Sequence, residues 1–149
     1  MLTAVVAIPA PAIPNVLREC GEHDVGAAMV LSAGFGEVGK RGLALQSEIV
    51  DTARTNDIPL VGPNCLGIIR PDRGLNITFG NNNAQPGSLA FVSQSGAICT
   101  AILDWAEKND IGFSAVVSTG IAADLDFGDY LDFLVSDPAT KAILLYIEG

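Results

Sequence analysis

The stretch LAFVSQSGAICTAILDWA, residues 89–106, changes from a strand pattern to a helix pattern within a few residues. Leu89 to Val92 are uninterrupted apolar residues, as expected for a strand that is buried on both faces. After Gly96 the apolar residues recur at the spacing of one helix face: Ile98, Ile102, Trp105 and Ala106. A strand followed at once by a helix is half of a βα unit, so this stretch predicts an α/β fold.

The junction between this strand and this helix consists of Ser93, Gln94, Ser95 and Gly96. The first amides of a helix have no carbonyl partner one turn earlier and lie at the positive end of the helix dipole, so they favour a bound anion. Glycine permits a close approach of the backbone to a ligand, and serine hydroxyls can donate further hydrogen bonds. The same residues also suit simple capping of the helix by one serine. An anion site and an ordinary helix cap therefore both stay open.

Strand and helix patterns also alternate from the beginning of the chain. The strand-like segments are residues 4–8, 26–32 and 60–61, and helical patterns lie between them near residues 13–20 and 40–54. Strands that are joined through helices return in the same direction across the sheet. The order β-α-β-α-β therefore predicts a parallel, doubly wound sheet.

Residues 62–87 break this alternation with proline, asparagine and glycine, and they contain one short β-like segment at residues 75–79. We place a domain boundary near Gln85, which predicts two α/β parts, residues 1–85 and 86–149. The second part continues with a strand at residues 113–117, a helix from about Phe127 and a strand at residues 142–147. Asp124 or Asp126 is expected to cap that helix.

The composition limits the possible functions. Hydrophobic residues make up 49% of the 149 residues and charged ones 17%, which excludes a disordered chain. The formal net charge is -9 with eight scattered Lys and Arg, which argues against a nucleic-acid partner. The apolar beginning is interrupted by prolines and has no basic leader, so we predict a cytoplasmic protein with no membrane partner. Three widely spaced cysteines predict reduced, buried thiols.

Two further loops follow predicted strands. GFGEVG, residues 34–39, matches the dinucleotide pattern G-x-G-x-x-G. It follows an internal strand and lacks the acidic residue that should end the next strand, so we expect an ordinary loop that is well placed to contact a ligand. GPNCLG, residues 62–67, is a rigid turn that either presents an amide and a thiol to a ligand or reflects ordinary turn chemistry.

Few residues suit acid–base or metal chemistry. His23 is the only histidine and lies among charged residues at the end of a predicted helix, so we expect no catalytic role for it. Glu148 follows an apolar strand and is either an exposed acid or one that orients a catalytic partner. The sequence contains no Walker lysine motif, catalytic triad or metal-ligand cluster, so we expect no metal site.

Four segments together resemble the NDP-forming acyl-CoA synthetases, relatives of the succinyl-CoA synthetase α subunit. The segments are IPAP (8–11), SAGFGE (32–37), GPNCLG (62–67) and SQSGA (93–97). Their order and spacing match the family across nearly all 149 residues. The resemblance implies the C-terminal part of a Rossmann-like CoA-binding domain over residues 1–85. It implies the first part of a flavodoxin-like ligase domain over residues 86–149.

The resemblance also implies two groups of site residues. Those expected to bind CoA are Pro9, Pro11, Ser32, Ala33, Gly34, Asn64 and Cys65, the last two near its thiol end. Those expected to hold the phosphate of a catalytic histidine are Ser93, Gln94, Ser95 and Gly96, with Glu148 orienting the imidazole.

Enzymes of this family pass a phosphoryl group from ATP to a histidine and then to a carboxylate, and CoA converts the acyl phosphate into a thioester. The implied cofactors are CoA, and ATP or ADP with Mg in the full-length protein. The implied partners are a small carboxylate substrate and an ATP-grasp domain or β subunit, within an oligomer. An uncharged nest of N–H and O–H groups would stabilise the phosphoryl oxygens in this acidic chain.

Three departures from the family limit these expectations. The phosphohistidine would lie beyond Gly149, and the glycine-rich turn that grips the CoA nucleotide would precede Met1. We therefore expect a truncated chain that is catalytically silent and binds CoA weakly or not at all. Ile121 stands where relatives often carry Asn, which weakens a ligand role for residues 120–124. Two other functions stay open: the regulatory region of a protein lysine acetyltransferase, and a stand-alone CoA or nucleotide binder.

Overall fold

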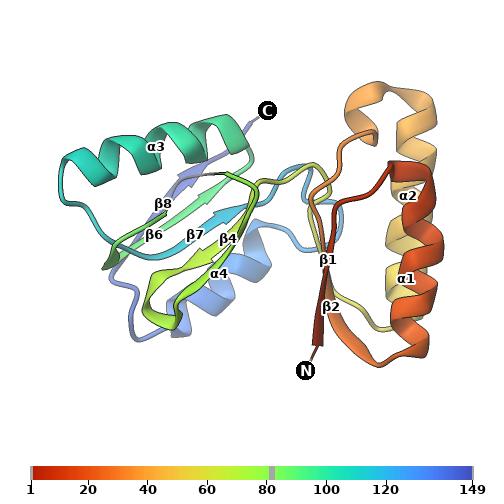
Figure 1. The fold of residues 1–149 in the computed structure, drawn as a ribbon, viewed down its shortest axis with the longest axis horizontal. Helices are drawn as coiled ribbons and strands as arrows, with labels where there is room; N and C mark the ends of the chain where they lie inside the picture. Colours follow the sequence, from red (N-terminus) through yellow and green to blue (C-terminus); the bar gives the residue numbers. More distant parts are fainter. Residues whose placement is uncertain (1, 81–82, 149) are drawn as a thin grey trace. The chain divides into compact units, whose positions relative to one another are not determined.

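The computed structural model describes residues 2–80 and 83–148. The chain divides into two compact units, which are described separately. The first comprises Met1–Cys65 and Ile121–Leu125, and the second comprises Leu66–Gly120 and Asp126–Gly149. Both units combine strands and helices, as the sequence predicts (Figure 1). Within the described ranges, none of the helices has the length and apolar content that crossing a bilayer requires.

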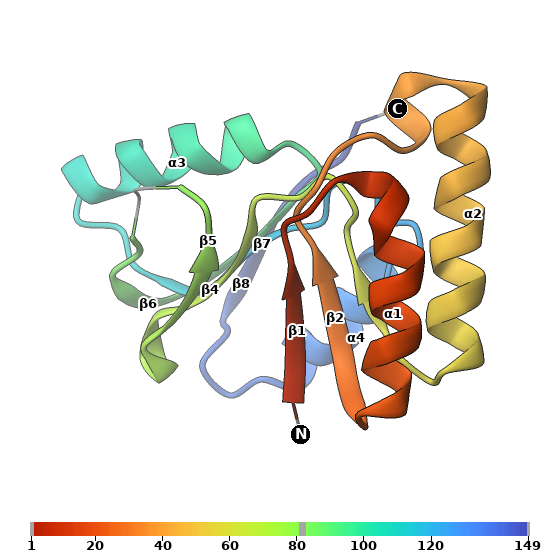
Figure 2. The same ribbon diagram turned by 45° about the vertical axis from the view of Figure 1, so that its right-hand side comes forward.

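The first unit is a parallel sheet with its helices on one face. Its strands are β1 (Leu2–Val6), β2 (Val25–Val30) and β3 (Leu60–Val61), and they pair in that order. Its helices are α1 (Ile13–Glu22) and α2 (Lys40–Thr55), which follow the 3-10 turns η1 (Ala10–Ala12) and η2 (Gly36–Val38). Figures 1 and 2 show α1 and α2 side by side over β1 and β2. The predicted β-α-β-α-β order and parallel sheet are confirmed.

The core of the first unit lies between this sheet and its helices. Ile13 and Leu17 of α1 and Ile49 and Ala53 of α2 are completely buried, which confirms helices at the two helical patterns near residues 13–20 and 40–54. Phe35, in the loop after β2, is completely buried in the same core. Burial of a side chain of this size contributes roughly 1.5–3 kcal/mol. The core therefore holds the loop that follows β2 against the helices.

The second unit is a five-stranded sheet in the order β5-β4-β7-β6-β8. Its strands are β4 (Gly67–Arg70), β5 (Leu75–Thr78), β6 (Pro86–Ser93), β7 (Phe113–Ser118) and β8 (Ala142–Tyr146). The last three run parallel, whereas β4 and β5 form an antiparallel hairpin through the 3-10 turn η3 (Pro71–Arg73), and β4 pairs antiparallel with β7. Strand β4 was not predicted from the sequence, because four residues between turn residues are too few to show a period.

The helices of the second unit, α3 (Gly96–Lys108) and α4 (Phe127–Ser136), pack on the two faces of this sheet (Figure 1). Phe91 of β6 and Val116 of β7 pack against α3. Because successive side chains of a strand point to opposite faces, the residues next to them in β6 and β7 face α4. Cys99, Leu103 and Ala106 form the buried face of α3. Trp105 was expected on that face but is 54% exposed. The predicted face, with Ile98 and Ile102, is thus displaced by one residue from the observed one, with Cys99 and Leu103.

Asp126 caps α4, as one of the two predicted alternatives. Its carboxylate accepts a hydrogen bond from the N–H of Gly128 at 2.7 Å, and its own N–H donates to the Asp129 carboxylate at 2.8 Å. This reciprocal pair is a capping box. The other candidate, Asp124, has a different role in the first unit, described below.

The compact units do not divide the chain at Gln85. They separate between Cys65 and Leu66, because β4 pairs with β7 and thereby adds the hairpin to the second unit. Ile121–Leu125 returns to the first unit, where the N–H groups of Ile121 and Ala123 donate to the carbonyls of Pro63 and Gly62 at 2.9 and 3.0 Å. A boundary near Gln85 between sequence domains stays a prediction.

We predict that Gly42→Ala destabilises the first unit, although alanine is normally the better helix residue. A Cβ at residue 42 would overlap the carbonyl oxygen of Phe35, so the loop or the helix must move. Overpacking of this kind costs about 1–3 kcal/mol, which exceeds the roughly 0.5–1 kcal/mol gained from helix propensity. Urea unfolding followed by circular dichroism measures the loss. The control Ser47→Ala, exposed on α2, should change stability by less than about 0.5 kcal/mol, and equal stability of both variants would contradict the prediction.

Candidate functional site

The strand order of the second unit creates a switch point beside β6. From β6 the chain passes to β7 on one side and then to β8 on the other. The connections that follow β6 and β7 lead to α3 and α4 on opposite faces of the sheet, and in open α/β sheets ligands bind beside such a strand. The chain at the ends of β6 and β8 contains Ser93–Gly96 and Glu148, so the structure brings together both parts of the predicted phosphate site.

The serines of the loop after β6 serve the loop itself. Ser93 is completely buried, and its Oγ accepts a hydrogen bond from the Ser95 N–H at 3.1 Å and donates to the Ser95 carbonyl at 3.0 Å. Ser95 is the N-cap of α3, and its Oγ accepts a long hydrogen bond of 3.4 Å from the Ile98 N–H. The capping interpretation is therefore correct for Ser95, whereas Ser93 shapes the turn.

The backbone at the start of α3 is what this loop offers to a ligand. The N–H groups of Gly96 and Ala97 belong to the first two residues of the helix, where no carbonyl lies one turn earlier. A Cβ at residue 96 would lie 3.4 Å from the Leu66 Cβ, an ordinary contact, so packing does not require glycine there. Two open amides at the positive end of a 13-residue helix suit a phosphate oxygen without any basic side chain.

Gln94 ties this loop to the end of β8. Its N–H donates to the carbonyl of Tyr146 at 3.1 Å, and its side-chain Oε1 accepts from the N–H of Glu148 at 2.7 Å. Glu148 is exposed, and its backbone position is set by this contact. The predicted cradle and the predicted orienting acid are thus hydrogen-bonded to each other.

Sequence reasoning missed the polar layer beneath the cradle. Thr119 is buried, and its N–H donates to the Ser93 carbonyl at 2.8 Å. Ser118, also buried, accepts the Leu66 N–H at 2.9 Å through its Oγ. The completely buried Cys99 has its pKa raised to about 11 by burial, against the opposing effect of hydrogen bonds with Ser93 and Ser118. The run of small polar residues that ends β7 was the available signal.

The three predicted CoA segments meet at the carboxyl edge of the sheet in the first unit. The Ser32 hydroxyl donates to the Ile8 carbonyl at 2.6 Å, which joins the loops after β1 and β2. The Asn64 N–H donates to the Ser32 carbonyl at 3.0 Å, which adds the turn after β3. Gly34 packs closely against Ala10, the residue between Pro9 and Pro11 in the sequence: a Cβ added at Gly34 would lie 3.1 Å from the Ala10 Cβ. Pro9–Pro11, Ser32–Gly34 and Asn64–Cys65 therefore lie side by side at this edge.

Asn64 and Cys65 differ in what they expose. Asn64 is exposed and has a φ of 56°, the left-handed conformation expected of asparagine in a tight turn. Cys65 is 3% exposed, and its Sγ lies 3.4 Å from the Val30 carbonyl oxygen. The Cys65 side chain faces the interior, as the prediction of buried thiols requires, so only the backbone of this turn and Asn64 face outward.

The amides of the GFGEVG loop are bound to side chains of the protein itself. The Gly34 and Phe35 N–H groups donate to the two oxygens of Glu37 at 2.5 and 3.1 Å, and the Gly36 N–H donates to Gln46 Oε1 at 3.1 Å. In a dinucleotide-binding turn the glycine-rich backbone is available to the pyrophosphate. The amides of this loop therefore have partners within the protein. That the loop is not a dinucleotide fingerprint stays a prediction.

Asp124 holds Ile121–Leu125 in the first unit. Its carboxylate accepts the Leu60 N–H at 3.0 Å and pairs with the Arg54 guanidinium at 2.9 Å. The side chain of Asp124 is 12% exposed, and that of Arg54 is 65% exposed. The segment that contains Ile121 thus has a structural function beside β3.

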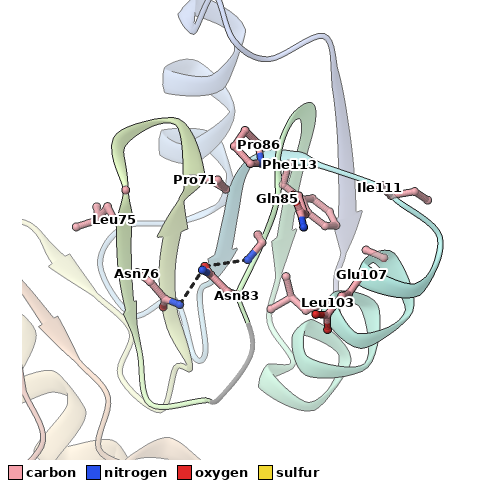
Figure 3. A pocket seen from close by; sticks show the side chains of 13 residues that line it. Pro71, Leu75, Asn76, Asn83, Gln85, Pro86, Leu103, Glu107, Ile111 and Phe113 are labelled. Atoms are coloured by element: carbon pink, nitrogen blue, oxygen red, sulfur yellow. Dashed lines mark hydrogen bonds between the residues drawn. The ribbon is translucent and has the colours of Figure 1, made fainter.

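A separate cavity of about 360 Å³ lies in the second unit, at the amino ends of β6 and β7 (Figure 3). Leu103 and Phe113 supply apolar walls, and Asn76 and Asn83 face each other at 3.5 Å between Nδ2 and Oδ1. Among the described residues that line it, Glu107 is an acid and none is Lys or Arg, which disfavours an anion. The described lining also includes none of the predicted site residues, so the cavity is separate from the phosphate loop.

The remaining candidates from the sequence are the histidine, the possible metal ligands and the cysteines. His23 is exposed and forms the C-cap of α1. Across residues 2–80 and 83–148, no three His, Cys, Asp or Glu side chains gather closely enough to hold a metal ion. All three cysteines are buried, as predicted, and none of them forms a disulfide within the part of the chain that the structure describes.

Two protein-family models match the chain. Residues 1–71 match the CoA binding domain, and residues 86–149 match the succinyl-CoA ligase like flavodoxin domain. Together the two matches include both groups of candidate site residues, one in each domain.

Characterised relatives and solved structures agree with these matches. The chain is 45% identical to acetate–CoA ligase [ADP-forming] I of Archaeoglobus fulgidus, over 98% of its own length and 21% of that protein. It is 44% identical to the α subunit of acetate–CoA ligase [ADP-forming] I of Pyrococcus furiosus, covering 32% of that subunit. The dinucleotide forming acetyl-coenzyme A synthetase 1 of Ca. Korarchaeum cryptofilum, solved with phosphate and ADP, superposes with a TM-score of 0.95 at 38% identity. The match covers all of this chain and 32% of that one.

We predict that Glu37→Gln removes one acid-sensitive contribution to stability. Burial raises the pKa of Glu37, but hydrogen bonds from the backbone N–H groups of Gly34, Glu37 and Phe35 outweigh it and leave the pKa lowered. A lowered folded-state pKa stabilises the fold above the unfolded value of about 4.3, and this contribution is lost as the pH falls through the folded pKa.

The stability difference between wild type and Glu37→Gln should thus be greatest above about pH 5 and shrink toward pH 3. Because Glu37 is exposed, we expect a difference of at most about 1 kcal/mol. Urea unfolding of both proteins between pH 3 and pH 7 measures it. A difference that stays constant with pH would contradict the prediction.

Proposed function

The chain belongs to the NDP-forming acyl-CoA synthetase family, and from this premise we propose that it forms part of an enzyme that makes acyl-CoA. The proposed reaction consumes a carboxylate, CoA and ATP and releases acyl-CoA, ADP and phosphate. The chain spans only 21–32% of the relatives described above, so the remaining parts of the enzyme would lie outside it. The observation that carries the proposal is the pairing of a phosphate-type helix start with Glu148 in the domain that follows the CoA domain.

The second unit would stabilise a phosphoryl group during transfer. A histidine outside this chain would receive the group from ATP and pass it to the carboxylate, and CoA would displace phosphate from the acyl phosphate. The Gly96 and Ala97 N–H groups would donate to the phosphoryl oxygens, and their strength would come from preorganisation, because Ser93 and Ser95 already fix the turn. Glu148 would accept an N–H of the imidazole and hold its orientation.

The first unit would receive CoA at the carboxyl edge of its sheet. Loops from three strands supply backbone groups and small side chains there, and Ser32 joins all three through its hydroxyl and its carbonyl. CoA supplies the thiol that attacks the acyl phosphate. Ser32, Gly34 and Asn64 would position the cofactor rather than take part in the chemistry.

The proposed partners follow from the same family. Two relatives in Pyrococcus furiosus are named as α subunits, and this chain covers 32% of each, whereas it covers 21% of the acetate–CoA ligase I of Archaeoglobus fulgidus. We infer an ATP-grasp part that binds ATP or ADP with Mg, either as a β subunit or in the same chain. The cytoplasm, where ATP and CoA are available, is the proposed location.

The direct test is an assay of the longest form of the protein that includes a histidine downstream of Gly149. Incubation with ATP, CoA and acetate should yield acetyl-CoA and ADP, and ATP alone should label a histidine with phosphate. A well-folded wild type that forms neither thioester nor phosphohistidine would exclude the proposal.

In the same protein, we predict that Glu148→Gln slows histidine phosphorylation by roughly 10- to 100-fold, because an amide orients the imidazole less strongly than a carboxylate. Acid-labile phosphate incorporation from labelled ATP measures the rate. The control is Glu107→Gln, the same substitution near the C-terminal end of α3 and thus away from the phosphate loop at its start. This variant should keep the wild-type rate. Equal rates for both variants would exclude a role for Glu148.

A further inference from the structure

Three successive amides of the loop after β2 are satisfied by two side chains. Glu37 accepts the Gly34 and Phe35 N–H groups with one carboxylate oxygen each. Gln46, on α2, accepts the Gly36 N–H. Neighbouring N–H groups that converge on one point form a nest that suits an anion. Here the protein supplies that anion itself.

The loop that Glu37 holds is the one that carries Ser32, Ala33 and Gly34. Phe35 anchors it in the core, and Gly42 of α2 lets the helix backbone approach the Phe35 carbonyl. On the other side, Gly34 has a φ of 111° and lies against Ala10. The backbone of Gly34 is thus constrained by the core, by Ala10 and by the Glu37 carboxylate.

Glu37 also places a negative charge on this loop. Its carboxylate is exposed at the loop and stays ionised near neutral pH, because its backbone hydrogen bonds lower its pKa. The amides that could bind a phosphate are already used, and a negative charge lies beside them. A phosphate would meet repulsion at this loop, whereas an uncharged amide or hydroxyl group would not.

We propose that Glu37 is a positioning residue of the CoA site: together with Gln46 it holds the Ser32–Gly36 loop in the shape that receives CoA and directs the loop toward an uncharged part of that molecule. The assignment rests on the proposed function, because it takes CoA as the ligand of this edge. Glu37 acts through the backbone of Gly34 and Phe35 and takes no part in phosphoryl or acyl transfer.

The geometry distinguishes the possible replacements. Glutamine is nearly the same size but has one acceptor oxygen, and its NH₂ group would face the second backbone N–H. Glu37→Gln therefore loses one bond and adds a donor–donor contact. Gln46→Glu keeps an acceptor oxygen for the Gly36 N–H, whereas Gln46→Ala removes it. The conservative variant should rescue function at residue 46 and fail to do so at residue 37.

The test measures steady-state kinetics of the whole synthetase. Glu37→Gln and Glu37→Ala should raise KM for CoA about tenfold, as expected for the loss of a hydrogen bond to a charged group. They should leave kcat and the KM values of ATP and acetate within about twofold. Gln46→Ala should raise KM for CoA severalfold, and Gln46→Glu should restore it. Glu48→Gln, an exposed acid on α2 that pairs with Arg18, is the matched control and should behave as wild type.

A second substrate tests the direction of the loop. Dephospho-CoA lacks only a phosphate, so its KM should rise by the same factor as that of CoA in Glu37→Gln. A factor that differs more than threefold between the two substrates would place a phosphate near Glu37 and overturn the proposal. Unchanged KM for CoA in both Glu37 variants would overturn it as well.

Amide hydrogen exchange in the 149-residue chain tests the loop without any catalysis. The Gly34 and Phe35 amides should exchange at least about tenfold faster in Glu37→Ala than in wild type, while the amides of β2 stay protected. Unchanged exchange would show that Glu37 does not hold the loop. Failure of the proposed function would appear differently, as a wild-type enzyme that forms no thioester.

Discussion

The parallel direction of the strands is the constraint on which the rest of this structure depends. Parallel neighbours must be joined through crossovers, so every loop that leaves a strand toward a helix opens at the same edge of its sheet. In the first unit this edge collects the loops after β1, β2 and β3, which Ser32 joins. In the second unit the order β7-β6-β8 leaves a switch point beside β6, where Gln94 meets Glu148.

The loops at these two edges treat their backbone amides in opposite ways. The Gly34–Gly36 amides donate hydrogen bonds to Glu37 and Gln46, so they are not available to an anionic ligand, and Glu37 adds a negative charge to the loop. At the start of α3, serine side chains fix the turn, and the Gly96 and Ala97 amides keep the open positions of a helix N-terminus. Backbone amides need hydrogen-bond partners. A glycine-rich loop can therefore bind an anion only where the protein's own side chains do not already accept its amide hydrogens.

Several connections depend on residues far apart in the chain. Ile121–Leu125 reaches the first unit because its alternate N–H groups bond the carbonyls of residues 60, 62 and 63, and Asp124 returns a bond to the Leu60 N–H. The β4–β5 hairpin joins the second unit through β7. Neither pairing has a local pattern, which explains why a boundary near Gln85 does not describe the compact units.

The sequence by itself determined the α/β class, the parallel order of the first unit, the positions of the helices and the identity of the loops that end strands. These features follow from apolar periodicity and from turn residues, which act over a few neighbouring positions. Only the tertiary structure decided that Ser93 is buried in its own turn, that Cys65 faces inward, and that Glu37 fills the nest of its own loop. It also decided that Trp105 lies outside and that β4 exists. The physical reason is that a hydrogen bond or a buried surface needs a partner, and the sequence does not say which distant residue will provide it.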